Sequence, residues 1–328
     1  MTMKQAGFNL IELMIALVVG IVLMASITTM FVDTKLSANR SSTVSNLQQQ
    51  AQLALQILVE DVRSIGSWAE FSGEAISDIK VPNMVAGNCS IVPAVGVVNT
   101  GNAHLPATAN WVLRANLANA IGVASINIDN VCLAPDHTIS DDSDVISIAR
   151  IRGSITAISD IESASYYVAI SPQQAQLFKG DTPNSATNTD NVEIYPYLHH
   201  TYFVQSHETE GTRLSRFSFI DGVFTNDLVV GNIEKIRIDF GIDNNNDGRP
   251  DNYSISNNVT DAMWVNNQIV AARIYVLARA KNKDVALNNN QAYNARFRPF
   301  TPTNNDNYRR FLLATTVVIK NNMMAVTQ

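Results

Sequence analysis

The sequence has few cysteines, few basic residues and no familiar catalytic motif. Two cysteines among 328 residues exclude a disulfide-rich scaffold. There are 23 lysines and arginines against 29 aspartates and glutamates, so the net charge is −6, which argues against nucleic-acid binding by bulk electrostatics. No G-x-S-x-G, phosphate-loop or dinucleotide fingerprint occurs. We therefore expect no catalytic residues, no enzymatic activity, no required cofactor and no direct nucleic-acid binding.

Charge is absent over one long segment near the N-terminus. From Leu13 to Val32 there is no charged residue, and twenty residues are enough for a helix to cross a hydrocarbon core of about 30 Å. A short polar leader with Lys4 precedes it, and Glu12 lies just inside it, where a charge is costly and usually functional. A secretory signal peptide would have a shorter apolar core with a small-residue cleavage site after it. A plain membrane anchor would not explain the glutamate.

Residues 7–13, Gly-Phe-Asn-Leu-Ile-Glu-Leu, resemble the class III signal of type IV prepilins and pseudopilins. Asn9 replaces the threonine or serine of the usual G-F-T-L-I-E form. The resemblance implies that a membrane peptidase cuts between Gly7 and Phe8 on the cytoplasmic side and that the new amine of Phe8 is methylated. A carboxylate buried in an apolar helix needs a cation. The new amine of Phe8 would supply it, either one helical turn away or on a neighbouring subunit, and in the family the contact with the neighbour sets the register during filament assembly. The alternative is a glutamate at a helix N-terminus that is favoured only by the helix dipole.

The helix is predicted to continue beyond the apolar segment. Residues 33–67 contain no proline, and their only glycine is Gly66. Apolar side chains recur there every three or four residues, which indicates one buried stripe on a helix. The stripe consists of Val44, Leu47, Ala51, Ala54, Leu58, Val62 and Ile65. We expect a single helix from about Asn9 to about Ile65, whose first half lies in lipid or a filament core and whose second half packs on a sheet.

The rest of the chain is predicted to be rich in strands. Residues 66–142 have short apolar runs and many turn residues, which favours loops and short strands. Later segments are rich in β-branched and aromatic residues and are bounded by Gly, Asn, Asp or Pro. The expected strands are 145–151, 165–171, 201–206, 212–220, 232–242, 270–280 and 311–320. The predicted fold is α+β and pilin-like, with a long N-terminal helix on a mainly antiparallel sheet. Its parts are a leader (1–7), a membrane or filament-core half-helix (8–32), an amphipathic half-helix (33–67) and a periplasmic body (68–328).

Four segments of the body are similar to blocks of PilW-type minor pilins: 47–66, 201–219, 228–248 and 270–280. This resemblance implies a minor pilin that assembles with other minor pilins and the major pilin, primes the type IV pilus and sits at its tip, with roles in twitching motility, adhesion and DNA uptake. It also implies a prepilin peptidase and an inner-membrane assembly platform as partners. The N-terminus would lie in the cytoplasm, the single span in the inner membrane and the body in the periplasm, before assembly into the surface pilus. Two alternatives stay open: a minor pseudopilin of type II secretion, and an anchored periplasmic binding or adhesive protein.

A loop of aspartates and asparagines is the best candidate for a metal site. The order D-x-N-x-D-G-x-x-D places oxygen side chains at alternate positions with Gly248 at the tight turn, as in loops that wrap calcium. The ligands would be Asp243, Asn245, Asp247, Asp251 and the carbonyl of Arg249. Position 12 is Ser254 rather than a glutamate, which argues against an EF-hand. A plain hairpin turn, which these residues also favour, is the alternative.

Two other groups of residues have weaker predictions. If the body lies outside the cytoplasm, Cys89 and Cys132 are allowed to form a disulfide, and two reduced, buried thiols are the alternative. His199, His200 and His207 match no compact metal site, and we expect them to be surface residues that flank a strand.

Overall fold

The computed structural model describes residues 9–65, 69, 111–114, 137–140, 142–171, 175–181, 191–220, 223–255, 258–259, 263, 266, 268–284, 287, 289–302 and 306–319. The helices and strands are α1 (Leu10–Arg63), β1 (Trp111–Arg114), β2 (His137–Ile139), β3 (Asp144–Ile151), the 3-10 turn η2 (Ile158–Asp160), β4 (Tyr166–Ile170), β5 (Ala175–Lys179), β6 (Glu193–His207), β7 (Gly211–Ile220), β8 (Val223–Gly231), β9 (Ile233–Ile242), β10 (Asn252–Ile255), β11 (Ile269–Lys283) and β12 (Tyr308–Val318). The chain divides into two compact units, Met1–Asn46 and Leu47–Gln328. The predicted leader, the cleavage position and both cysteines lie outside the described residues.

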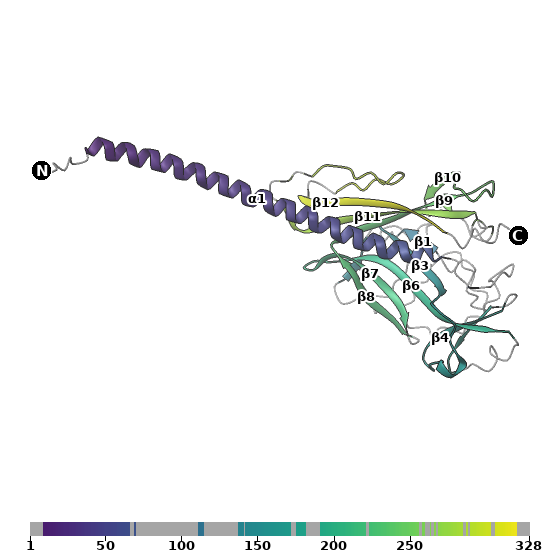
Figure 1. Ribbon diagram of the computed structural model, residues 1–328. Coiled ribbons are helices and arrows are strands. Elements are labelled where there is room, and N and C mark those ends of the chain that lie inside the picture. The colour runs from purple at the N-terminus through teal and green to yellow at the C-terminus, as the bar shows by residue number, and fades with distance from the viewer. Residues whose placement is uncertain are drawn as a thin grey trace, which may run out of the picture. The chain divides into compact units, whose positions relative to one another are not determined.

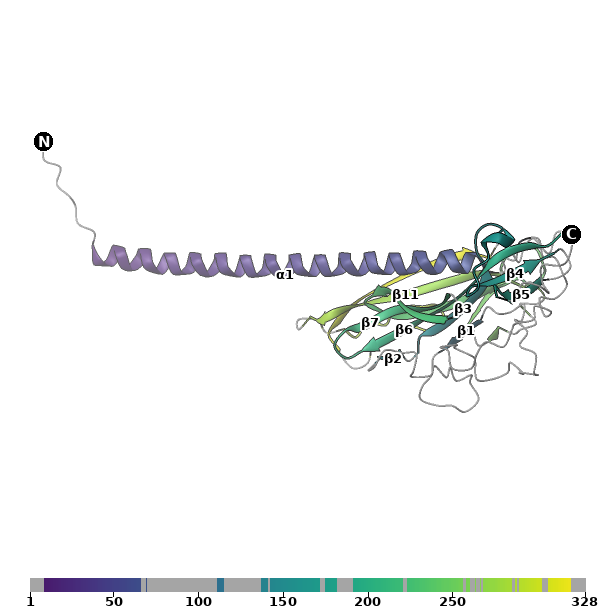
Figure 2. The ribbon, with the colours of Figure 1, turned by 90° about the horizontal axis from the view of Figure 1, so that it is seen from below.

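The helix α1 contains 54 residues and runs without interruption, as Figure 1 and Figure 2 show. Its bounds lie within two residues of the predicted ones at each end. No proline interrupts it, and glycine follows only at position 66, so nothing in the sequence stops the helix earlier. The prediction of one continuous helix is therefore confirmed.

The part of α1 in the second unit buries the predicted stripe. Leu47, Ala51, Ala54, Leu58 and Val62 are at most 3 % exposed. They contribute to one core together with side chains of both sheets, among them Ile146, Tyr202, Leu214, Ile236, Phe240, Ile274 and Val276. Burial of apolar surface holds this part of α1 to the body. Each Å² of apolar surface that is removed from water stabilises the packed state by roughly 25 cal/mol.

The larger sheet has eight strands and is organised around the long strand β6. The main path is β1-β3-β6-β4-β5, while β2 and β7 also pair with β6, and β8 pairs with β7. All of these pairings are antiparallel. Different segments of β6 pair with β4, with β3 and with β7, so this one strand connects the whole sheet.

The smaller sheet has the order β10-β9-β11-β12 and is also antiparallel. Its strands are green to yellow in Figure 1, and the teal and green strands of the larger sheet form a separate layer. Alternate residues of β9 face the common core, including Ile236, Ile238 and Phe240. The α+β architecture with a long N-terminal helix and antiparallel sheets is thus confirmed.

The connection between β11 and β12 packs on the other face of the smaller sheet. Phe300 and Ala295 form a second cluster with Tyr275 and Leu277, two residues of β11 that are not part of the main core. Tyr293 and Phe300 bridge within the connection. Within this connection, the side chains of Asn289, Ala295 and Phe300 are buried.

Candidate assembly surface and polar sites of the body

The first unit presents an apolar surface along α1. Every large apolar side chain from Leu10 to Leu36 is exposed, by 47 % to 75 %. They are Leu10, Ile11, Leu13, Met14, Ile15, Leu17, Val18, Val19, Ile21, Val22, Leu23, Met24, Ile27, Met30, Phe31, Val32 and Leu36. Among the described residues, α1 alone is long and apolar enough to cross a membrane, with a mean hydropathy of 2.7 over an 18-residue window. The exposure of so large an apolar surface to water costs free energy. This surface of α1 therefore needs lipid or other apolar helices around it.

The hydroxyl groups in this part of α1 are satisfied within the helix. The hydroxyls of Ser26, Thr28 and Thr34 donate to carbonyls four residues earlier, at 2.7–2.9 Å, and Thr29 donates to the carbonyl of Ser26 at 2.9 Å. These are all the hydroxyl side chains between positions 10 and 36. Because a hydroxyl without a partner is costly in hydrocarbon, this arrangement suits a helix surrounded by lipid or by other helices.

Glu12 lies in the first turn of α1. Its backbone N–H donates to the carbonyl of Asn9 at 3.0 Å, and Leu13 N–H donates to the same carbonyl at 3.2 Å. The carboxylate is therefore close to the positive end of the helix dipole. Glu12 is exposed in this unit. The helix thus has one acidic residue at the start of a segment that is otherwise uncharged for twenty residues.

A buried aspartate joins α1 to the larger sheet within the second unit. Asp61 is 5 % exposed, and its carboxylate receives three side-chain donors from β3 and β6. Arg150 Nη2 donates to Oδ1 at 2.9 Å, Tyr202 OH donates to Oδ2 at 2.5 Å, and His200 Nδ1 lies 2.6 Å from Oδ2. We call Asp61, Arg150, His200 and Tyr202 the Asp61 cluster.

The electrostatics of the Asp61 cluster favour the ionised carboxylate. Burial alone would raise the pKa of Asp61, but hydrogen bonds from His200, Tyr202 and Arg150 and the charge of His200 hold that pKa well below its usual range. Burial and the neighbouring Asp61 carboxylate raise the pKa of the Tyr202 phenol, which stays a neutral donor. The prediction of surface histidines was wrong for His200, whose side chain is 12 % exposed and pairs with Asp61.

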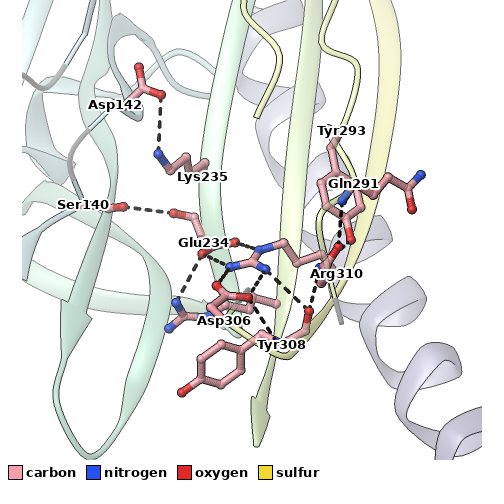
Figure 3. A network of polar contacts seen from close by, with 11 residues as sticks. Ser140, Asp142, Glu234, Lys235, Gln291, Tyr293, Asp306, Tyr308 and Arg310 are labelled. Carbon is pink, nitrogen blue, oxygen red and sulfur yellow. Dashed lines mark hydrogen bonds and ion pairs between the residues drawn. The ribbon is translucent and has the colours of Figure 1, made fainter. Parts of the chain in front are cut away.

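A second polar network lies on the smaller sheet, where β9, β11 and β12 meet (Figure 3). Glu234 accepts from Arg310 Nε at 2.5 Å and Nη2 at 2.9 Å, and from Arg279 Nη1 at 3.2 Å. Arg310 also donates to Asp306, at 2.8 Å from Nη1. Arg310 is almost fully buried, with 3 % of its side chain exposed, so these carboxylates compensate a charge that would otherwise be costly.

The segment predicted as a calcium loop forms the turn between β9 and β10. Asp243 is buried, and its Oδ1 accepts backbone N–H bonds from Asn245 at 3.1 Å, Asn246 at 2.7 Å and Asp247 at 3.3 Å. Its Oδ2 accepts from Gly248 N–H at 2.7 Å. Asn246 and Gly248 have φ of 60° and 81°, in the left-handed region that these residue types tolerate. The hairpin turn is therefore held by Asp243 itself.

The other predicted ligands lie at the edge of this turn. The side-chain amide of Asn245 is 3.4 Å from a carboxylate oxygen of Asp247 and of Asp251, and Arg249 N–H donates to Asp247 Oδ1 at 2.8 Å. Within the described part of the chain, no three His, Cys, Asp or Glu side chains gather as a metal site. Calcium binding at this loop stays a prediction.

Asp247→Ala tests the calcium prediction. If calcium binds, the variant is expected to have a lower melting temperature than the parent protein in about 2 mM calcium, which exceeds the dissociation constants of extracellular calcium sites. In chelator the two proteins should have the same melting temperature. The measurement is thermal unfolding followed by circular dichroism. An equal loss in calcium and in chelator would identify an ordinary turn.

The body shares sequence features with a known family. The matched region begins in β6 and extends through β12, so it contains the Glu234–Arg310 network and the Asp243 turn. Residues 201–321 match the type IV pilus-assembly protein W family. This confirms the predicted resemblance to PilW-type pilins, and type IV pilins are structural proteins of the cell envelope.

Four chains of solved structures are similar to this one. A type IV-like pilin from Thermus thermophilus is 10 % identical, with a TM-score of 0.32 over 84 % of this chain and 97 % of that chain. No curated protein matches the sequence.

The structure also assigns roles that the sequence patterns did not. Asp61 falls on the same face of α1 as Ala54 and Leu58, both of which are buried. A carboxylate on a buried apolar stripe needs a partner, so its position could have indicated a buried ion pair. The described residues do not include Cys89, Cys132, Gly7 or Phe8. The disulfide and the processing site therefore stay predictions.

Proposed function

We propose that this protein is a minor pilin that assembles with other minor pilins to prime a type IV pilus and sits at its tip. The observation that carries the proposal is the match of residues 201–321 to type IV pilus-assembly protein W, on a chain whose α1 exposes an apolar surface from Leu10 to Leu36. The family match supports the pilus, and the apolar helix supplies a means of assembly. Motility, adhesion and DNA uptake would follow from the pilus as a whole.

In this proposal, assembly consists of packing apolar helices side by side. Apolar contacts have no direction, so two such helices can slide along one another at little cost. One ion pair in the apolar layer removes this freedom, because its carboxylate is poorly solvated in every other register. Glu12 supplies the carboxylate, and the amine of Phe8 on the neighbouring subunit supplies the cation.

The same proposal specifies maturation and orientation. A prepilin peptidase cuts between Gly7 and Phe8 at the cytoplasmic face of the inner membrane, and Phe8 is then methylated. The span is retained, so the body stays anchored in the periplasm until the assembly platform transfers it into the pilus. The major pilin and the other minor pilins are the neighbours that provide helices and amines.

Mass spectrometry of the N-terminus tests this function directly. We expect the protein recovered from sheared pili to begin at methylated Phe8, without residues 1–7. The membrane fraction should contain the same mature form together with some precursor. The measurement needs only intact-mass and N-terminal peptide spectra of both fractions.

Two results would contradict the proposal. A protein that keeps Met1 or Thr2 in cells with an active prepilin peptidase would not be a prepilin substrate. A mature protein that is confined to membranes and absent from pili would instead be part of an assembly platform or a secretion pseudopilus.

A further inference from the structure

The larger sheet contains a cavity that the proposed pilus assembly does not use. It has a volume of about 610 Å³, and its walls are β3, β4, β6, β7 and the segment that connects β3 to β4. This volume is within the range of about 300–1,000 Å³ that is typical of ligand-binding pockets. The whole lining belongs to the second unit, so the cavity is a feature of the body and not of the apolar surface of α1.

Two of the three arginines in the lining are already compensated by carboxylates. Arg150 Nη2 donates to Asp61 at 2.9 Å, and Arg216 Nη2 lies 3.6 Å from a carboxylate oxygen of Asp227. An anionic ligand at either guanidinium would compete with a carboxylate that the fold itself supplies. These two arginines therefore do not make the cavity a site for anions.

The remaining charged groups of the lining have both signs. Arg152, Asp160 and Glu162 are exposed, and all three belong to the segment that connects β3 to β4. In the described part of the chain, none of the three forms an ion pair. One cation against two carboxylates leaves no excess of positive charge, and a strongly charged ligand of either sign would meet groups of its own sign. The lining therefore favours a ligand without net charge.

The lining is nevertheless polar. Its apolar members are Pro196 and Leu198, and all the others carry guanidinium, carboxylate, imidazole or hydroxyl groups. An apolar ligand would remove water from these groups without offering them hydrogen bonds, which is costly. The composition of the lining therefore argues against an apolar ligand as well as against a charged one, and it leaves neutral polar molecules.

The lining offers both acceptors and donors of hydrogen bonds. Asp160 accepts from the hydroxyl of Ser159 at 2.9 Å, and Glu162 accepts from the hydroxyl of Ser165 at 3.2 Å. An ionised carboxylate has about four acceptor positions, so each can accept further bonds, while the guanidinium of Arg152 can only donate. A hydroxyl group donates and accepts at once. A ligand with several neighbouring hydroxyl groups can therefore bond to both kinds of group.

Three tyrosines contribute aromatic surface to the same cavity. Tyr167 and Tyr197 are at most 8 % exposed, whereas Tyr166 is half-buried, so Tyr166 has the ring that a ligand can cover. The hydroxyl of Tyr167 accepts from the backbone N–H of Glu162 at 3.0 Å, which fixes the segment that carries the carboxylates beside β4. A sugar ring has apolar C–H faces and hydroxyl groups at its edge, so it can contact an aromatic ring and polar groups together.

We propose that this cavity binds a neutral oligosaccharide, whose hydroxyl groups bond to Arg152, Asp160 and Glu162 and whose ring covers Tyr166. The class of ligand follows from a lining that has no excess of positive charge, that both donates and accepts, and that is partly aromatic. The site is built by one body alone, so it binds the sugar in the isolated protein as well as in an assembled pilus. Binding therefore does not depend on the proposed assembly function.

Saturation-transfer NMR with the full-length protein tests the proposal. The protein is kept in a zwitterionic detergent, because a detergent with a sugar head group would compete for the site. The probes are two neutral disaccharides, lactose and N,N′-diacetylchitobiose, and the control probe is the neutral peptide acetyl-Gly-Ser-Gly-Ser-amide. We expect a signal from at least one disaccharide, strongest at its ring C–H protons, and none from the peptide. The disaccharide that binds identifies whether the site prefers galactosides or N-acetylated sugars.

Variants locate the binding. Glu162→Ala removes an acceptor of hydroxyl groups and is expected to weaken the sugar at least about fivefold, because a hydrogen bond to a charged group contributes about 1.5–3 kcal/mol. Tyr166→Ala is expected to weaken it by a similar factor, whereas Tyr166→Phe keeps the ring and should bind like the parent protein. Glu208→Ala removes an exposed acid outside the cavity and should leave binding unchanged. Melting temperatures confirm that each variant is folded.

Three results would overturn the proposal. The absence of a signal from both disaccharides would mean that the cavity is not a sugar site. Equal losses in Glu162→Ala and Glu208→Ala, or full binding by Tyr166→Ala, would place the sugar outside this cavity. A signal from the peptide but from neither disaccharide would identify a site for neutral peptides.

Discussion

The Glu12→Ala protein is expected to be inserted and cleaved like the parent protein but to be missing from sheared pili. On a neighbouring subunit, the amine of Phe8 would then face an apolar layer without its carboxylate. Removing one partner of a buried ion pair costs about 3–5 kcal/mol. At about 1.4 kcal/mol per tenfold change, incorporation should fall by at least about a hundredfold. Immunoblots of the sheared and membrane fractions measure this ratio.

Asp33→Ala is the matched control for this experiment. Asp33 is also an exposed acid of α1, but it lies at the far end of the uncharged segment, two residues before Lys35. Its replacement should leave incorporation within about twofold of the parent protein. Normal incorporation of Glu12→Ala, or an equal loss in both variants, would remove Glu12 from the proposed assembly mechanism.

The helix and most strands could be predicted because their causes are local. The stripe from Leu47 to Val62 follows the helical period, and the structure buries those side chains. The two longest strands, β6 and β11, extend beyond the predicted 201–206 and 270–280, because backbone pairing continues past the apolar segment. Three strands were missed: β5, β8 and β10. β10 contains four residues and pairs with β9 only, so its pairing rather than its own composition makes it a strand.

The polar sites of the body could not be predicted, because their partners are distant in the sequence. The Asp61 cluster joins residues that are 89, 139 and 141 positions apart. No periodic pattern specifies such pairs, which depend on the packing of α1 against β3 and β6. The assembly features differ in this respect, because Glu12 and the apolar segment are contiguous.

The connection between β11 and β12 shows the same limit. Its many polar residues predict a long loop, and a long loop is often mobile. In the structure, Arg298 forms a bidentate pair with Asp144, at 2.8 Å and 2.6 Å, across 154 positions of sequence. Arg237, which is 2 % exposed, lies over the ring of Phe300 at 4.1 Å. These charged contacts hold the connection against both sheets, although its composition resembles that of a free loop.

Asp61→Ala is expected to lower the free energy of unfolding of the body by about 3–5 kcal/mol at pH 7. The substitution leaves the Arg150 guanidinium and the buried Tyr202 hydroxyl without their acceptor, and it removes the contact between α1 and His200 of β6. Glu60→Ala is the matched control, because Glu60 is the adjacent acid and is exposed. Its effect should stay within about 0.5 kcal/mol.

Asp61→Asn isolates the charge from the shape. An asparagine keeps an acceptor for Arg150 and Tyr202, but it has no negative charge, so the variant should be less stable than the parent protein by a smaller amount than Asp61→Ala. Urea unfolding of the full-length protein in detergent, followed by tyrosine and tryptophan fluorescence, gives all three free energies. Equal stability of the parent protein and both Asp61 variants would mean that apolar packing alone holds α1.

The pH dependence of this difference follows from the pKa of Asp61. The folded protein holds that pKa well below its usual range, whereas an aspartate in the unfolded chain has a pKa of about 3.9. The contribution of the carboxylate is therefore fully present well above pH 4 and is lost progressively as the pH falls below that value, because the unfolded chain takes up the proton first. The difference in unfolding free energy between the parent protein and Asp61→Asn should therefore narrow from about pH 4 downward. A difference that stayed the same down to about pH 2 would assign the stabilisation to the shape of the side chain rather than to the charge of Asp61.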